Sequence, residues 1–518
     1  MSANANNIFK AFARATHRTP DAEALIYRDR RWTYADLHAA ATRAATGMFE
    51  AGVSSGDRVA FLAHNSDVYV IGFLATQLLG AIHVPLNFRL EVPEILYILD
   101  HCSPKFLYSD TACMPAAEFA SAASIAKSPV LEIENLGLTE TAVTLAESGG
   151  HRDASTAAQL AYTSGTESRP KGALLSDNGL LLQYMSCIEA GDYTSSDVVV
   201  HAMPLYHCAQ MHCFLLPSLL LGARNVLLEG AEPAAIIDAI RRHQATSFFA
   251  PPTVWIGILA DSSVASRDLS GLKKGYYGAS IMPREVLAKM RIQLPWLGLW
   301  NYYGQTEIGP LATALRPQEH ARRPASVGRP VLFVETRIVD EQMRTLPPGA
   351  VGEIVHRSPQ LLLEYYHDPQ KTAEAFQDGW FRSGDLGVAD EQGYLTVVDR
   401  KKDMIKTGGE NVASREVEEV IYQHPAVSEV AVIGLPDARW VERVCAFVVL
   451  RPGSEADASQ IIAHTACLAS FKRPKQVIFV RELPKNPSGK IMKRELRKWA
   501  AAICGSDRDV GQEPGTCH

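Results

Sequence analysis

Short apolar runs alternate with amphipathic stretches along the first part of the chain. Apolar runs at 58–62 and 82–85 flank a helix-like segment, and similar runs return at 198–202, 225–228 and 247–249. A short apolar run followed by a segment with helical periodicity is the pattern of strand, helix and parallel strand. It predicts a large α/β body whose sheets are covered by helices.

After residue 330 the pattern changes to strand-like pieces separated by glycine turns, at 335–339, 352–356 and 394–398. These pieces predict a β-rich subdomain that closes the body. A charged cluster, DRKKD at 399–403, then predicts a hinge.

Beyond the hinge, a helix-like segment, SREVEEVIYQH, precedes strand patterns at 427–433, 443–450 and 476–480. This part predicts a small, mobile α+β lid. The domains expected from the sequence are an N-terminal domain over 1–400, a C-terminal lid over 401–502 and a disordered tail over 503–518.

Size and composition narrow the class of protein. A chain of 518 residues exceeds the size at which single hydrophobic cores stop growing, which supports more than one domain. The formal net charge of -6 argues against nucleic acid as a partner, because polyanion binders carry basic surfaces. The nine cysteines lack paired metal-ligand spacing, which indicates free thiols in a reducing compartment.

The N-terminus carries polar and charged residues where a secretory signal has an apolar core, so the cytoplasm is the expected location. The apolar stretch at 68–86 is interrupted by Gln77, His83 and Pro85. A buried helix followed by a buried strand fits this stretch better than a membrane span, and no stable membrane insertion is expected.

The segment YTSGTESRPKG at 162–172 has the composition of a phosphate-binding loop. Its hydroxyl and glycine residues can approach phosphates closely, and the lysine that follows can reach the β and γ phosphates. By itself this composition also fits a solvated surface loop, and its spacing is not that of a Walker motif. The candidate residues are Thr163, Ser164, Gly165, Thr166 and Lys171.

This loop and four further motifs, in the same order and spacing, resemble the adenylate-forming superfamily of acyl-CoA synthetases, peptide-synthetase adenylation domains and luciferases. The resemblance runs from about residue 8 to about residue 500. It implies that a carboxylic acid is activated by ATP as its acyl-adenylate, with release of pyrophosphate, and is then transferred to a thiol. It also implies ATP, Mg²⁺ and coenzyme A as small-molecule partners, and it makes the domain over 1–400 the AMP-binding and acyl-binding domain.

The segment YYGQTEIGP at 302–310 is similar to the family's YGxTE motif. The resemblance implies that Tyr303 and Gly304 contact the adenine side, that Thr306 touches the α phosphate, and that Glu307 holds magnesium together with Thr166. A carboxylate beside a triphosphate needs such a bridging cation. A turn at Gly278, Ala279 and Ser280 matches the family's turn against the adenine.

Two further motifs match the ribose side and the hinge. GWFRSGDL at 379–386 places Asp385 where the family binds both ribose hydroxyls, and a carboxylate can accept both hydrogen bonds. In VVDRKKD at 397–403, Arg400 matches a second ribose contact and Lys402 matches the pivot of the lid.

The lid carries two candidate lysines for two half-reactions. KNPSGKIMKR at 485–494 resembles the terminal motif whose lysine, here Lys490, enters the active site during adenylation. KTGGE at 406–410 resembles the loop that lines the pantetheine tunnel after the lid rotates, with Lys406, Gly408 and Gly409 as its expected coenzyme A contacts.

The resemblance also suggests the acyl pocket, with His207 at its mouth. Its expected wall is apolar and lacks a cation, and consists of His207, Met211, Tyr276, Gly278, Trp300, Tyr302, Ile308 and Leu311. Strand alternation places the bulky Trp300 and Tyr302 on one face, which favours a fatty acid of medium length, while a packed core position for Trp300 stays open.

Several alternatives remain at this point. A benzoate- or cinnamate-type acid is the second substrate class, and a carrier protein is the second thiol acceptor. Homodimer formation is left open. Glu167 and Ser168 depart from the phosphate loop of the family, and the sequence does not assign them a role.

Overall fold

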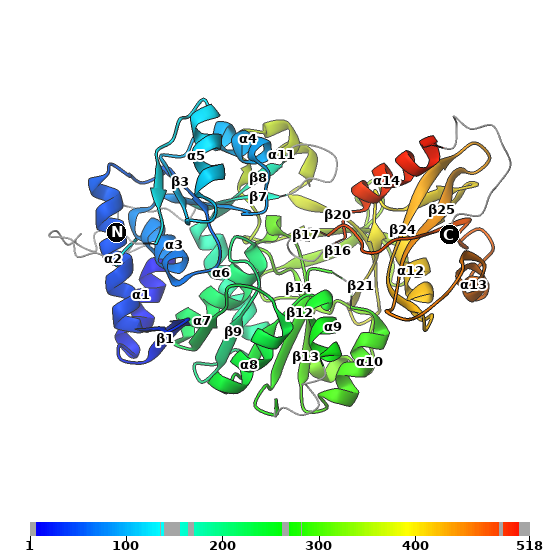
Figure 1. Cartoon of the computed structure of the whole chain (residues 1–518), viewed down its shortest axis with the longest axis horizontal. Helices are drawn as coiled ribbons and strands as arrows, with labels where there is room; N and C mark the ends of the chain where they lie inside the picture. The colour runs from blue at the N-terminus through cyan, green and yellow to red at the C-terminus, as the bar shows by residue number, and fades with distance from the viewer. Residues whose placement is uncertain are drawn as a thin grey trace.

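The computed structural model describes residues 7–134, 136–138, 156–163, 170–261, 269–280, 282–485 and 491–506, with side chains as far as residue 502. A large mixed α/β body and a smaller lid make up the chain, as the sequence predicts (Figure 1). In Figure 1 the lid, coloured yellow to red, lies to one side of the body.

One sheet of the body holds nine strands, and the central ones are parallel. In spatial order they are β15 (Arg329–Pro330), β14 (Thr313–Leu315), β13 (Gly298–Tyr303), β12 (Lys274–Gly278), β11 (Ser247–Phe249), β9 (Val198–His201), β10 (Arg224–Leu227), β1 (Glu23–Tyr27) and β2 (Arg30–Thr33).

A second sheet of the body holds seven strands and ends in an antiparallel edge that carries the phosphate-loop segment. Its order is β18 (Glu364–Tyr365), β8 (Lys171–Ser176), β7 (Ala157–Thr163), β4 (Ile82–Leu86), β3 (Arg58–Leu62), β5 (Phe106–Ser109) and β6 (Val130–Glu132).

The β-rich subdomain forms a third, antiparallel sheet. Its strands are β16 (Glu335–Val339), β17 (Gly352–Arg357), β20 (Trp380–Ala389), β19 (Phe376–Gln377) and β21 (Leu395–Arg400). The lid sheet begins a few residues later, with β23 (Glu410–Val412), β22 (Ile405–Thr407), β25 (Val441–Leu450), β24 (Val427–Asp437) and β26 (Gln476–Phe479).

Helices cover the sheets of the body and flank the lid sheet (Figure 1). Those of the body are α1 (Ile8–Arg18), α2 (Tyr34–Glu50), α3 (Asp67–Leu79), α4 (Val92–Cys102), α5 (Met114–Ala123), α6 (Asp177–Ala190), π-helix η1 (Ala209–Leu215), α7 (Leu216–Leu221), α8 (Pro233–His243), α9 (Pro252–Ala260), α10 (Arg284–Gln293) and α11 (Pro369–Ala375). Those of the lid are α12 (Ser414–Tyr422), α13 (Ala458–His464) and α14 (Lys493–Ser506).

Local signals explain several boundaries. Ser66 caps the start of α3 by accepting a hydrogen bond from the backbone N–H of Tyr69, and Gly80 ends the helix in the left-handed conformation, which glycine adopts without strain. Every residue of α3 except Leu79 is buried, and it leads into the buried strand β4. No helix among the described residues is long and apolar enough to span a membrane.

The body and the lid have separate hydrophobic cores. One large cluster runs through the body, while the two faces of the lid sheet pack their own clusters around residues such as Val432 and Phe447. Helix α14 continues to Ser506, and residues 507–518, which belong to the tail predicted over 503–518, lie outside the described residues.

Candidate active site

A cavity with a volume of about 2350 Å³ is lined by residues of both the body and the lid. The carboxyl ends of the parallel strands β11, β12 and β13 open into it, which is where α/β sheets usually place ligands. It has two chemically distinct ends. The polar end contains Tyr303, Asp385 and Arg400, and the aromatic end contains Tyr302, Phe214 and Phe249.

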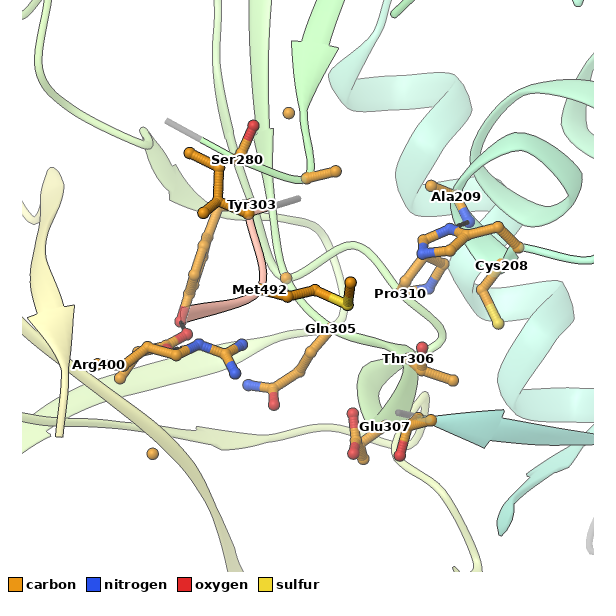
Figure 2. Close-up of a pocket in the computed structure, with 18 of the residues that line it drawn as sticks. Cys208, Ala209, Ser280, Tyr303, Gln305, Thr306, Glu307, Pro310, Arg400 and Met492 are labelled. Carbon is orange, nitrogen blue, oxygen red and sulfur yellow. Dashed lines mark hydrogen bonds and ion pairs between the residues drawn. The ribbon is translucent and has the colours of Figure 1, made fainter. Parts of the chain in front are cut away.

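The polar end is organised around the carboxylate of Asp385. The Tyr303 hydroxyl donates to Asp385 Oδ2 at 2.7 Å, and Arg400 Nε lies 3.2 Å from Asp385 Oδ1 (Figure 2). The pairing of β20 with β21 sets Asp385 directly opposite Arg400. Burial, followed by the Asp385 carboxylate, raises the pKa of Tyr303, so the hydroxyl stays protonated and donates. Asp385 therefore contacts both Tyr303 and Arg400, the other two of these residues that were predicted to bind the adenosine.

Close backbone packing explains two glycines at this end. A Cβ on Gly278 would lie 2.4 Å from the Tyr302 carbonyl oxygen, and a Cβ on Gly304 would lie 2.0 Å from that of Pro310. Neither position accepts a side chain without a shift of the backbone. Ala279 has a positive φ of 64°, and it lines the cavity together with Ser280.

The turn that follows β13 carries Thr306 and Glu307, and both residues line the cavity (Figure 2). The Tyr365 hydroxyl donates to Glu307 Oε1 at 2.9 Å, and Lys171 Nζ lies 4.9 Å from the centre of the Tyr365 ring. A carboxylate next to a hydroxyl residue offers hard oxygen ligands, the donor set that Mg²⁺ prefers. Glu307 therefore fits a magnesium ligand chemically, and Thr166, the other predicted ligand, lies outside the described residues.

Two buried glutamines, which the sequence analysis missed, hold this turn from behind. Gln183 Oε1 accepts from the backbone N–H of Leu311 at 3.2 Å and from Gln360 Nε2 at 3.0 Å. Ser186 donates to the other end of Gln360 at 2.7 Å. Both glutamines are 2% exposed or less. Nothing in the local sequence marks them, because the pairing joins positions far apart in the chain.

The phosphate-loop segment joins β7 and β8, in which Thr163 pairs with Lys171. Both of these residues line the cavity. The predicted contacts Ser164, Gly165 and Thr166 lie outside the described residues, as do Glu167 and Ser168.

The lid presents one of its two lysine motifs to the cavity. Lys485 and Ile491 form an antiparallel bridge, and both line the cavity together with Met492. Lys490 itself lies between them, outside the described residues. Lys402 also lines the cavity, in the turn between β21 and β22.

The second lysine motif lies away from the cavity. Lys406 is exposed, its backbone N–H donates to Glu442 Oε2 at 2.7 Å, and Gly408 packs against Trp440. Lys406, Gly408 and Gly409 do not belong to the cavity lining in this orientation of the lid.

The aromatic end is lined by His207 and by a stack of three rings that close it at depth. Phe214 lies 4.3 Å from Phe249 and 5.7 Å from Tyr302 between ring centres, with interplanar angles of 15° and 17°. Leu311 and Gly278, both expected on the acyl wall, also line the cavity. Phe249 was missed, although its place at the carboxyl end of a predicted strand was a signal.

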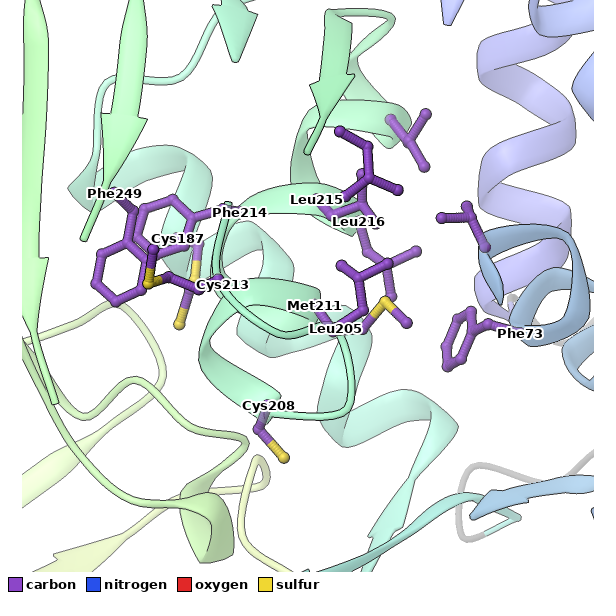
Figure 3. Close-up of a cluster of buried hydrophobic side chains, with 14 of the residues drawn as sticks. Phe73, Cys187, Leu205, Cys208, Met211, Cys213, Phe214, Leu215, Leu216 and Phe249 are labelled. Atoms are coloured by element: carbon purple, nitrogen blue, oxygen red, sulfur yellow. The ribbon is translucent and has the colours of Figure 1, made fainter. Parts of the chain in front are cut away.

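Four residues expected on the acyl wall do not line the cavity. Met211 lies on the side of η1 that faces Phe73, away from Phe249 (Figure 3). Tyr276 and Trp300 lie behind Tyr302 as parts of the core, and Ile308 is completely buried. Helical and strand periodicity identifies a face, but it does not give the depth at which a side chain lies.

The fold and this site define a two-domain nucleotide-binding enzyme with a lid over its cavity. Residues 12–366 match the family model of the AMP-binding enzymes, and residues 416–490 match that of the AMP-binding enzyme C-terminal domain. The chain belongs to this family, in the acyl-CoA synthetase branch of the adenylate-forming ligases.

Two relatives and one solved structure illustrate the similarity. The chain is 34% identical to a feruloyl-CoA synthase of Amycolatopsis, covering 94% of this chain and 97% of that protein. It is 33% identical to an indoleacetate–CoA ligase of Aromatoleum aromaticum, covering 93% and 96%. The structure of ATP-bound MatB from Rhodopseudomonas palustris superposes with a TM-score of 0.89 at 29% identity, covering 96% and 100%.

Proposed function

We propose that the enzyme activates an aromatic carboxylic acid without a second charged group as its acyl-adenylate and transfers the acyl group to coenzyme A. The observation that carries this proposal is the single cavity that joins Asp385 and Arg400 to an end closed by aromatic rings. Thr306 and Glu307 line the same cavity, and we assign to them the place where the carboxylate of the acid and the α phosphate of ATP meet.

In the first half-reaction a carboxylate oxygen attacks the α phosphorus, the bond from that phosphorus to the β-phosphate oxygen breaks, and pyrophosphate leaves. Two anions approach each other in this step, so preorganised cations lower the barrier. Lys171 from the body and Lys490 from the lid are the cations that we assign to it. Magnesium, held by Glu307 and Thr166, would neutralise the phosphates when bound.

In the second half-reaction the sulfur of coenzyme A attacks the acyl carbonyl carbon, the thiol loses its proton, and AMP leaves. We assign this step to a second lid orientation in which Lys406, Gly408 and Gly409 replace Lys490 at the cavity. Lids commonly gate consecutive steps in this way. His207 lines the cavity, and we assign to it a contact with the thioester-forming atoms.

The ring stack favours an aromatic acid over the medium-chain fatty acid that the sequence favoured. Stacked aromatic pairs contribute about 0.5–1.5 kcal/mol beyond the area that they bury. Among the described residues near Phe214 and Phe249, the lining is apolar, aromatic or neutral, and an acid with a second charge would be left unpaired. The two relatives named for ferulate and indoleacetate support the same class.

A panel assay tests the proposal. The protein is incubated with ATP, Mg²⁺ and benzoate, phenylacetate, cinnamate or the fatty acids from butanoate to dodecanoate, with and without coenzyme A. We expect pyrophosphate release with every accepted acid and a coenzyme A thioester only when coenzyme A is present, with the highest kcat/KM for an aromatic acid. A fatty-acid optimum would restore the medium-chain alternative, and acyl-adenylate without thioester would favour a carrier protein as the acceptor.

The hinge has its own test. Lys402→Pro restricts φ in the turn between β21 and β22, so it should spare acyl-adenylate formation and slow thioester formation. Lys402→Ala is the matched control because it removes the same side chain and leaves φ free. Normal thioester formation by the proline variant in single-turnover kinetics would show that residue 402 is not the pivot.

A further inference from the structure

The carboxyl end of helix α6 lies beneath the aromatic end of the cavity. The last carbonyls of a helix have no partner within the helix, and here they accept from aromatic side chains of the nine-stranded sheet. Tyr276 donates to the Gly191 carbonyl at 2.6 Å, and Trp300 Nε1 donates to the Ala190 carbonyl at 3.1 Å. These two rings are therefore fixed to the end of the helix.

Tyr302, the ring that lines the cavity, is held differently. Its hydroxyl lies 3.5 Å from the Cys187 carbonyl and 3.4 Å from the Tyr193 hydroxyl, longer than the usual O–H···O distance of about 2.5–3.0 Å. Its position is consequently determined by the space available to the ring, with little contribution from hydrogen bonds.

Gly191 provides that space. A Cβ at this position would lie 2.3 Å from the Tyr302 hydroxyl oxygen and 2.3 Å from Cε1 of Tyr193. The φ of Gly191 is -97°, which any residue can adopt. Position 191 therefore requires glycine because a side chain would clash there, and not because of its backbone conformation.

The other sides of the Tyr302 ring are filled. Phe214 lies 5.7 Å and Tyr276 lies 5.5 Å from it between ring centres. The cavity is the open side. A side chain at position 191 would push the ring in that direction, because closely packed interiors transmit such displacements.

We propose that Gly191 is a specificity-determining residue that sets the depth of the acyl pocket through Tyr302 without touching the substrate. This inference rests on the proposed function, since it concerns the acid that the enzyme accepts. It assigns a role to a residue at a helix end that has no atom in the cavity lining.

The test compares Gly191→Ala with the natural enzyme on the same panel of aromatic and fatty acids. We expect the ratio of kcat/KM for the larger to the smaller accepted acids to fall about tenfold, the scale of one methylene in an apolar pocket. The KM for ATP should stay unchanged. Gly47→Ala is the matched control, because a Cβ at that glycine in α2 meets nothing within 4 Å.

A double-mutant cycle identifies the transmitting residue. In a Tyr302→Ala background, Gly191→Ala should no longer change the size preference. An unchanged ratio in the single variant, or an equal fall in both backgrounds, would overturn the inference.

If Gly191→Ala does not fold, Tyr302→Leu tests whether the Tyr302 ring limits the depth of the acyl pocket. An unchanged size preference in that variant overturns the inference as well. A natural enzyme that forms no thioester with any acid contradicts the proposed function instead, so the two failures are distinguishable.

Discussion

The two ends of the cavity are built on different principles. At the polar end, Asp385 and Arg400 face each other on neighbouring strands, and their groups are available to a ligand. At the aromatic end, Phe214, Phe249 and Tyr302 form the pocket wall and the hydrophobic core at once. The difference teaches that changes at the polar end should affect ligand binding, whereas changes at the aromatic end should affect stability and the choice of acid together.

The largest expected effect comes from Trp300, behind the aromatic wall. Trp300→Ala removes a ring that is 5% exposed and lies 5.1 Å from the ring of Tyr276, so it should lower the free energy of unfolding by about 3–5 kcal/mol. Thermal and denaturant melts measure the loss. A variant of unchanged stability that prefers longer acids would show that Trp300 is part of the wall after all.

In the lid, Lys490→Ala should reduce acyl-adenylate formation by about 100-fold or more, the usual cost of removing one preorganised charge stabiliser. Thioester formation from preformed acyl-adenylate should be nearly unaffected, because the assigned second orientation withdraws this lysine. Lys475→Ala, at an exposed position of the same lid, is the control. Equal losses in both half-reactions would contradict the assignment of two lid orientations.

The sequence predicted the polar end better than the aromatic end for a physical reason. Gly304 and Glu307 belong to one continuous motif, because a turn is encoded by adjacent residues. The same holds for the strands: those expected at 247–249 and 335–339 have these bounds in the structure, because short apolar runs report burial directly.

The aromatic end combines residues whose proximity depends on tertiary packing. Alternation correctly placed Trp300 and Tyr302 on one face of β13, but two residues along a strand separate them by about 6–7 Å. Over that distance the strand passes from Tyr302, which lines the pocket, to Trp300, which lies in the hydrophobic core. Gly191 and Gln360 carried no sequence signal, since their roles depend on partners far along the chain.

A variant at the polar end tests ligand binding without loss of stability. Asp385→Asn keeps the shape of the side chain but removes the charge that would accept from both ribose hydroxyls, so the KM for ATP should rise about 10–100-fold. Its melting temperature should change little, because the amide oxygen of asparagine can still accept a hydrogen bond from the Tyr303 hydroxyl or from Arg400. Glu335→Gln, in an exposed ion pair of the same sheet, is the control. An unchanged KM for ATP would remove Asp385 from the nucleotide site.

The smallest effect is expected from Tyr276→Phe, which separates the role of one hydrogen bond from that of the ring. The variant keeps every ring contact and leaves the Gly191 carbonyl without its 2.6 Å donor. A hydrogen bond of this kind contributes about 0.5–1.5 kcal/mol, so the melting temperature should fall slightly while the KM for ATP stays the same. Because Tyr276 does not line the cavity, the preference among acids should change only if the end of α6 shifts and moves Tyr302 with it. A changed preference with unchanged stability would show that Tyr276 itself contacts the substrate, and the wall of the pocket would then extend one ring deeper than the cavity indicates.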